Sequence, residues 1–170
     1  SAPSAQVKSA VLLAGIQAQG VTSVREPALT RDHLERMLPL FGATVEREGA
    51  SARVRGPAAL HGAEIEVPGD FSAAAFLLAA AAIVPRSDIW IRGVGVNPTR
   101  TAFLDHVTRL GARIERVNER VVCGEPVADL WIRAGALLPA RVVAEDAPHL
   151  IDELPLVAVL AAFAEGKREV

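Results

Sequence analysis

Three short stretches of the sequence place polar side chains where they could bind or activate a charged substrate. The first is Ser4-Ala5-Gln6, which opens an apolar stretch of helical spacing with Ser4 at the N-cap position. The first N–H groups of a helix have no internal partner and the dipole is positive there, so this start could hold an anion. Two interpretations stay open: Ser4 caps only its own helix, or it also binds an anion.

The second stretch contains Arg31, directly after Thr30, which we predict to cap a second helix. A cation in the first turn opposes the helix dipole at a cost of about 0.3–1 kcal/mol. Arg31 is therefore either an anion ligand beside Ser4 or a solvated side chain paired with Asp32 or Glu35.

The third stretch is HLIDELPLV, in which Asp152 and Glu153 precede Pro155, a residue typical of a first helical turn. Asp152 could be a plain N-cap, as we expect of Asp70, or a general base. A carboxylate at a helix start is a weak base, so the second role needs close positioning and a charged partner supplied by the ligand.

The elements that must position these residues occur as a repeat. The sequence predicts the order helix, strand, helix, strand, strand, which then returns, and AVLAAF (158–163) opens a third copy. A repeat of about 65–80 residues indicates one supersecondary unit used several times, with the more apolar helices inside and sheets around them. Aligning the copies puts Asp70 and Asp152 at the position of Ala5, so polar chemistry gathers at helix starts.

The predicted elements follow from periodicity, caps and turn residues. The first helix is expected to end at Gly20, with its apolar face formed by Val7, Ala10, Val11, Ala14 and Ala18. The expected elements after it are a strand at 21–26, a helix from Thr30 to Gly42, strands at 43–48 and 52–56, a helix around 76–81, a strand at 88–95, a helix capped by Asn97 or Thr99 and closed by Gly111, and strands at 120–124 and 130–134.

Composition excludes several classes of function. The 170 residues are 51% hydrophobic, carry 18 basic and 20 acidic side chains and only 4% aromatics, so no nucleic-acid surface is expected. The longest apolar run, 71–85, is too short for a membrane span. The only cysteine, Cys123, is predicted to be a buried strand residue and fits a reducing, cytoplasmic compartment. The four histidines lack metal-ligand spacing, so no metal is expected.

Five motifs together resemble the 5-enolpyruvylshikimate-3-phosphate synthase family. They are SAQVKSAVLLAG, EPALTRDHLERML, PGDFSAAAFLLAAAA, RGVGVNPTRTAFLD and IDELPLVAVLAAFAEG, in the family's order and covering almost the whole chain. The resemblance implies an α/β (α+β) fold of repeated βαβαββ units, the inside-out α/β barrel of the enolpyruvyltransferases. It also implies that residues 1–66 are the last repeat unit of the shikimate-3-phosphate-binding domain. Residues 69–170 would be the first part of the second domain, reached by one strand crossing near Pro68.

The resemblance also implies a reaction and roles for particular residues. The 5-hydroxyl of shikimate 3-phosphate adds to C2 of phosphoenolpyruvate, and the tetrahedral intermediate loses phosphate, with no metal or organic cofactor. Ser4 and the backbone of Ala5 resemble the 3-phosphate ligands, and Gln6 resembles the side chain that meets both substrates. Arg31 resembles the arginine beside the shikimate ring, and Asp152 the carboxylate that accepts the 5-hydroxyl proton.

The family's N-terminal lysine-serine pair, its glycine-rich loop and its Lys-Glu-Ser-Asp-Arg segment are not in this sequence. Most phosphoenolpyruvate ligands are therefore missing, and we expect a fragment that is inactive alone and whose partners include the missing parts of the same enzyme. Two alternatives stay open. One is an enzyme like the UDP-N-acetylglucosamine enolpyruvyltransferase, which uses a loop cysteine unlike Cys123. The other is a non-catalytic module that binds a phosphorylated ligand.

Overall fold

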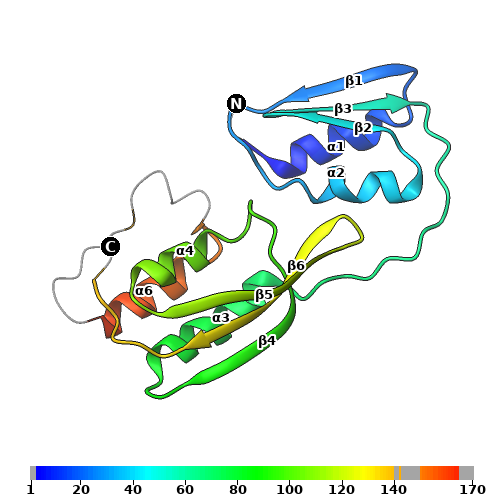
Figure 1. Cartoon of the computed structure of the whole chain (residues 1–170). Helices are drawn as coiled ribbons and strands as arrows, with labels where there is room; N and C mark the ends of the chain where they lie inside the picture. The colour runs from blue at the N-terminus through cyan, green and yellow to red at the C-terminus, as the bar shows by residue number, and fades with distance from the viewer. Residues whose placement is uncertain (1–2, 140–141, 143–149, 165–170) are drawn as a thin grey trace. The chain divides into compact units, whose positions relative to one another are not determined.

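The computed structural model describes residues 3–139, 142 and 150–164 (Figure 1). It divides the chain into two compact units. Unit 1 comprises Ser1–Val67 with Cys123–Glu125, and unit 2 comprises Pro68–Val122 with Pro126–Val170. Each unit has its own hydrophobic core, so each is described by itself.

Unit 1 is a three-stranded antiparallel sheet, in the order β1-β3-β2, with its helices on one face (Figure 1). The core between helices and sheet contains Leu12, Ile16, Leu38, Ala43, Ala52 and Val54. The elements are α1 (Ala5–Gly15), β1 (Gly20–Arg25), α2 (His33–Met37), the 3-10 helix η1 (Leu38–Phe41), β2 (Val45–Glu48) and β3 (Ser51–Gly56).

Helix α1 lies close to this sheet at Gly15. A Cβ atom there would come within 2.6 Å of Thr22 Cβ and 2.8 Å of Val54 Cγ2, closer than side chains tolerate. The absence of a side chain therefore lets the last turn of α1 approach β1 and β3. The helix ends here, so the prediction that it runs on to Gly20 is wrong. Gly20 instead opens β1 with a φ of 97°.

Unit 2 has a second three-stranded sheet, in the order β4-β6-β5, and a larger core in which α3 packs against β4, α4 and α6. Phe103, Leu78, Leu130 and Ile132 are fully buried there. The elements are α3 (Phe71–Ile83), β4 (Asp88–Gly95), α4 (Ala102–Arg109), β5 (Arg113–Val122), β6 (Glu125–Arg133) and α6 (Leu154–Phe163).

The predicted repeat is confirmed by the element order. Both units run helix, strand, helix, strand, strand, and in both the last strand lies in the middle of the sheet. Helix α6 provides the expected start of a third copy. The strand predicted at 88–95 coincides with β4. Segment 57–68 is not a strand, however, and only Gly69 forms an isolated bridge, with Val94, so the expected crossing strand is not formed.

The buried face of α1 differs from the predicted one. The buried residues are Lys8, Leu12 and Gly15, whereas Val7 is 63% and Val11 38% exposed. Apolar residues surround this helix on most sides, so periodicity alone could not select the face that meets the sheet. The face of α1 that is buried in the structure includes Lys8.

Several predicted local features also change. Helix α2 is short and continues as η1 because Pro39 cannot extend an α-helix, and Gly42 closes it in the left-handed conformation as expected. Thr101, not Asn97 or Thr99, is the N-cap residue of α4. Cys123 lies half-buried in the turn between β5 and β6 with a φ of 48°, so the prediction of a buried strand residue is wrong.

Candidate functional site

The start of α1 is the first part of the candidate site. Ser4 has an extended backbone (φ −149°, ψ 112°), and its Oγ accepts a hydrogen bond from Val7 N at 3.3 Å, which confirms the predicted N-cap. The same hydroxyl donates to Gln6 Oε1 at 3.3 Å, so the two polar side chains lie together. The first turn contains no acidic residue. A helix start without a carboxylate of its own is suited to an external anion.

Arg31 belongs to the same unit but does not stand where predicted. It lies half-buried in the segment between β1 and α2, and the helix begins only at His33. The N-cap residue of this helix is Asp32, so Thr30 does not cap it; the Thr30 hydroxyl donates to the Glu26 carboxylate. Arg31 therefore directly precedes the N-cap residue Asp32 and is not a first-turn residue.

The two carboxylates expected to neutralise Arg31 each bind another cation. Asp32 accepts from Arg36 Nε at 2.9 Å and from Arg47 Nη1 at 2.7 Å. Glu35 is buried and lies 2.7 Å from Lys8 Nζ.

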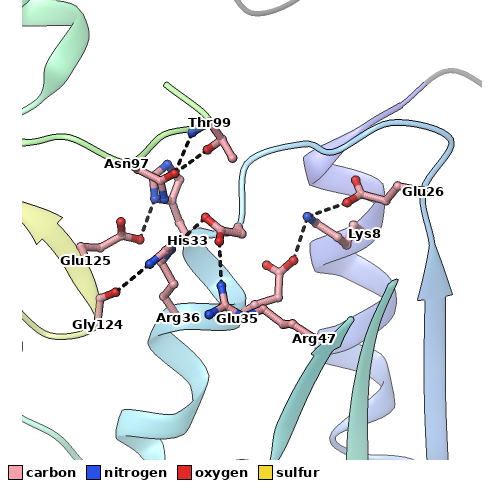
Figure 2. Close-up of polar contacts among 11 residues, drawn as sticks. Lys8, Glu26, His33, Glu35, Arg36, Arg47, Asn97, Thr99, Gly124 and Glu125 are labelled. Atoms are coloured by element: carbon pink, nitrogen blue, oxygen red, sulfur yellow. Dashed lines mark hydrogen bonds and ion pairs between the residues drawn. The ribbon is translucent and has the colours of Figure 1, made fainter. Parts of the chain in front are cut away.

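Lys8 was not identified as important from the sequence. Its ammonium group is buried between Glu26 Oε2, at 2.9 Å, and Glu35 Oε1, at 2.7 Å, as Figure 2 shows. Burial by itself lowers the pKa of Lys8, but the hydrogen bonds to Glu35 and Glu26 outweigh it and raise the pKa above its ordinary value. The available signal was a charged residue inside an otherwise apolar helical stretch.

Asp152 belongs to unit 2 and does not cap a helix. It lies in a turn before α6, whose N-cap residue is Glu153, and its side chain is 42% exposed. Asp70 does cap its helix, accepting from Ser72 N and Ala73 N at 3.2 and 3.0 Å. The two aspartates align in sequence, but Asp70 is an N-cap residue and Asp152 is not. The interpretation of Asp152 as an N-cap is therefore wrong.

A buried polar network lies next to Asp152. Arg100 Nη1 is 3.7 Å from Asp152 Oδ2, and Arg100 Nη2 donates to Ser72 Oγ at 2.6 Å. The Ser72 hydroxyl in turn donates at 2.7 Å to Oε1 of Glu153, which is 2% exposed. This chain fixes an arginine beside an accessible carboxylate. Arg100 was not singled out from the sequence because its partners come from α3 and the α6 start.

The candidate residues thus fall into two sets. Ser4, Ala5, Gln6 and Arg31 lie in unit 1, and Asp152 lies in unit 2. In the described part of the chain, no group of three or more His, Cys, Asp or Glu side chains could hold a metal ion. Nor does any described helix have the length and apolar character to cross a membrane.

Comparison with known proteins gives these residues a context. The family model described as EPSP synthase (3-phosphoshikimate 1-carboxyvinyltransferase) matches residues 1–170. The 3-phosphoshikimate 1-carboxyvinyltransferases of Gloeobacter violaceus and Acaryochloris marina are 56% and 53% identical to 96% of the chain, which covers 38% and 37% of those proteins. A structure of EPSP synthase from Acinetobacter baumannii superposes with a TM-score of 0.91 at 44% identity, over 98% of this chain and 38% of that one.

The match therefore extends over the whole sequence, includes both units and reproduces their fold, while the chain spans less than two-fifths of the length of these relatives. The fold is that of repeated units from the enolpyruvyltransferase α/β architecture, with only part of it in these 170 residues. The chain belongs to the EPSP synthase family.

Proposed function

We propose that the chain is the central part of an enzyme that transfers the enolpyruvyl group of phosphoenolpyruvate to the 5-hydroxyl of shikimate 3-phosphate. The products are 5-enolpyruvylshikimate 3-phosphate and phosphate. The observation that carries the proposal is the start of α1, where Ser4 and Gln6 meet at a helix start free of acidic side chains. The family of the chain supports a phosphorylated shikimate as the anion.

In unit 1, the 3-phosphate accepts hydrogen bonds from the Ser4 hydroxyl and the Ala5 backbone. A dianion at this place is stabilised by unpaired N–H groups and by the helix dipole. Gln6, next to Ser4 Oγ, contacts both substrates, and Arg31 lies beside the shikimate ring.

In unit 2, Asp152 takes the proton of the 5-hydroxyl while that oxygen bonds to C2 of phosphoenolpyruvate. The C2=C3 π electrons take up a proton at C3 as the tetrahedral intermediate forms. The intermediate then loses a C3 proton while its C2–O bond to phosphate breaks, which re-forms the C2=C3 double bond and releases phosphate. The exposure of Asp152 makes its carboxylate accessible to a hydroxyl, and Arg100 Nη1 lies 3.7 Å from its Oδ2. No step needs a metal or an organic cofactor.

Residues 1–66 are then the last repeat unit of the shikimate-3-phosphate-binding domain, and residues 69–170 the first part of the second domain. The segments of the family that lie outside these residues supply most of the cationic ligands of phosphoenolpyruvate. A single cysteine suits a reducing compartment, and we place the reaction in the cytoplasm.

Calorimetric titration of the 170-residue chain tests the proposal with three ligands: shikimate 3-phosphate, shikimate and UDP-N-acetylglucosamine. We expect binding of the first only, because the helix start selects the phosphate and Arg31 the ring. Preferential binding of UDP-N-acetylglucosamine would instead indicate the related transferase and overturn the proposal.

Ser4→Ala and Asp70→Ala form a matched pair of variants. Each removes a side-chain cap from the first helix of its unit, at a similar cost of about 0.5–2 kcal/mol in stability. Only Ser4→Ala should weaken binding of shikimate 3-phosphate, by at least tenfold. Equal affinities of the two variants would show that Ser4 is a cap alone.

A further inference from the structure

The buried charge cluster of Lys8, Glu26 and Glu35 (Figure 2) belongs to the same unit as the proposed phosphate site. The three side chains are only 3%, 7% and 2% exposed, so none of them can reach a substrate. Two carboxylates share one ammonium. The cluster therefore has a role in the fold or in the placement of other residues, and not in direct ligand binding.

Each member of the cluster lies next to a residue of the proposed site. Lys8 is one helical turn after Ser4, and its backbone N–H donates to Ser4 O at 3.1 Å. Glu26 follows β1 directly, and its second carboxylate oxygen accepts from the Thr30 hydroxyl, immediately before Arg31. Glu35 lies on α2, one turn after Arg31. The segment from Glu26 to Glu35 contains Arg31. The Lys8 ammonium binds the side chains at both ends of this segment and so links the segment to α1, the helix capped by Ser4.

The cluster is poorly arranged for stability alone. Glu35 Oε2 is buried and has no hydrogen-bond partner among the described residues. An unsatisfied buried oxygen is costly, and buried ionic groups often contribute no more to stability than apolar side chains of the same size would. The directional bonds of Lys8, which use two of its three N–H donors, do fix a distance between two elements.

We infer that Lys8 is a positioning residue of the shikimate 3-phosphate site, which sets the spacing between the start of α1 and Arg31. The inference rests on the proposed function. Ser4 and Arg31 are proposed to contact the phosphate and the ring of the same small molecule, so both must be held within about half an ångström of their binding geometry. Lys8 positions these residues through its ion pairs with Glu26 and Glu35 and does not contact the ligand.

The test compares Lys8→Met with Val54→Ala in the 170-residue chain. Val54 is buried in the core of the same unit on β3, and the ion pairs of the cluster do not involve it, so its truncation lowers stability and leaves these ion pairs in place. Affinity for shikimate 3-phosphate is measured by calorimetry at a temperature where circular dichroism shows both variants folded. Lys8→Met should weaken binding at least tenfold, equivalent to about 1.4 kcal/mol, and Val54→Ala less than twofold.

A second variant covers the case in which Lys8→Met does not fold. The triple change Lys8→Met, Glu26→Gln and Glu35→Gln leaves no buried charge unpaired, and such neutral replacements are usually tolerated. The triple variant should therefore fold. Because it still lacks the ammonium bridge, it should bind shikimate 3-phosphate at least tenfold more weakly than the unmodified chain. Hydrogen exchange should show faster exchange of amides in 26–35 in this variant than in Val54→Ala.

The outcomes separate the inference from the proposed function. If the unmodified chain binds shikimate 3-phosphate and the triple variant binds it equally well, the positioning role is overturned and the proposed function stands. If the unmodified chain does not bind the ligand, the proposed function fails, and the role of Lys8 in binding fails with it. Weakened binding by the Lys8 variants, with Val54→Ala unaffected, supports both.

Discussion

Units 1 and 2 have the same element order and sheet order but differ at the start of their first helices. Helix α1 begins with Ser4, a neutral cap whose hydroxyl also reaches Gln6. Helix α3 begins with Asp70, whose two carboxylate oxygens take the N–H groups of Ser72 and Ala73. An aspartate cap satisfies the helix dipole with its own charge, whereas a serine cap leaves that interaction to an external anion. Equivalent positions in a repeat can therefore have opposite capacities for ligand binding.

The units also hold their site residues by different means. In unit 1 the buried Lys8 ammonium bridges the carboxylates of Glu26 and Glu35, which precede and follow Arg31 in the sequence. In unit 2 an arginine, a serine hydroxyl and a buried glutamate form a chain that ends beside the exposed Asp152. The first arrangement joins two elements through buried charges, and the second leaves a carboxylate accessible to solvent.

The largest expected effect concerns the two units acting without the rest of the enzyme. The 170-residue chain by itself should bind shikimate 3-phosphate but show no turnover, because phosphoenolpyruvate would lack most of its cationic ligands. A phosphate-release assay with both substrates measures this. Adding the missing family segments as separate chains should restore activity. Release of phosphate by the chain alone, dependent on shikimate 3-phosphate, would contradict the prediction.

The next effect separates Asp152 from Asp70, both of which belong to unit 2. In the enzyme completed by those segments, Asp152→Asn should lower kcat by about 10²–10⁴, the contribution typical of a general base. Its stability should change little, because Asp152 is not the N-cap residue of α6 and its side chain is 42% exposed. Asp70→Asn keeps a good cap and should leave kcat unchanged. Indistinguishable turnover of the two variants under saturating substrates would remove Asp152 as the base.

A smaller effect tests the network behind Asp152. Ser72→Ala removes the hydrogen bond to the buried Glu153 carboxylate and should destabilise unit 2 by about 1–3 kcal/mol. Urea unfolding can be followed by tryptophan fluorescence, which reports unit 2 because Trp90 and Trp131 are the only tryptophans. The matched control Ser9→Ala, in α1, should leave the midpoint unchanged. A midpoint for Ser72→Ala equal to that of the unmodified chain would show that the network adds no stability.

The smallest effect is a difference in pH response between the units. The raised pKa of Lys8 stabilises unit 1 fully below pH 10.5, and this contribution is lost as the pH rises through the folded-state pKa. The lowered pKa of Asp88, caused by hydrogen bonds from Trp131 and Arg133, stabilises unit 2 above pH 3.8 and is lost as the pH falls.

Circular dichroism reports both units and tryptophan fluorescence only unit 2, and the chain has no tyrosine to titrate at high pH. Above pH 10.5 the dichroism should therefore change before the fluorescence. In Lys8→Met that early alkaline change should disappear. Simultaneous alkaline changes in both signals in the unmodified chain would remove the distinction between the units.

Local sequence was sufficient for features that depend on neighbours along the chain. The caps Ser4 and Asp70, the strand 88–95 and the helix-ending Gly42 follow from spacing and from residue types with specific backbone preferences. The repeat and the family were predictable as well, since the motifs recur in order. Each of these involves contacts within a few residues or a pattern visible without the fold.

Tertiary structure decided the features that depend on which surfaces meet. It selected the face of α1 that buries Lys8, because that helix is apolar on most sides and only the sheet could choose among them. In the folded chain the Thr30 hydroxyl binds Glu26 and does not cap a helix. Glu153 is the N-cap residue of α6, and Asp152 is exposed beside Arg100. Lys8 and Asp152 meet partners that are distant in sequence, so these energies enter only when the sheets and helices have packed. Thr30 and Glu26 are four residues apart, but the Glu26 carboxylate is also bound by the distant Lys8.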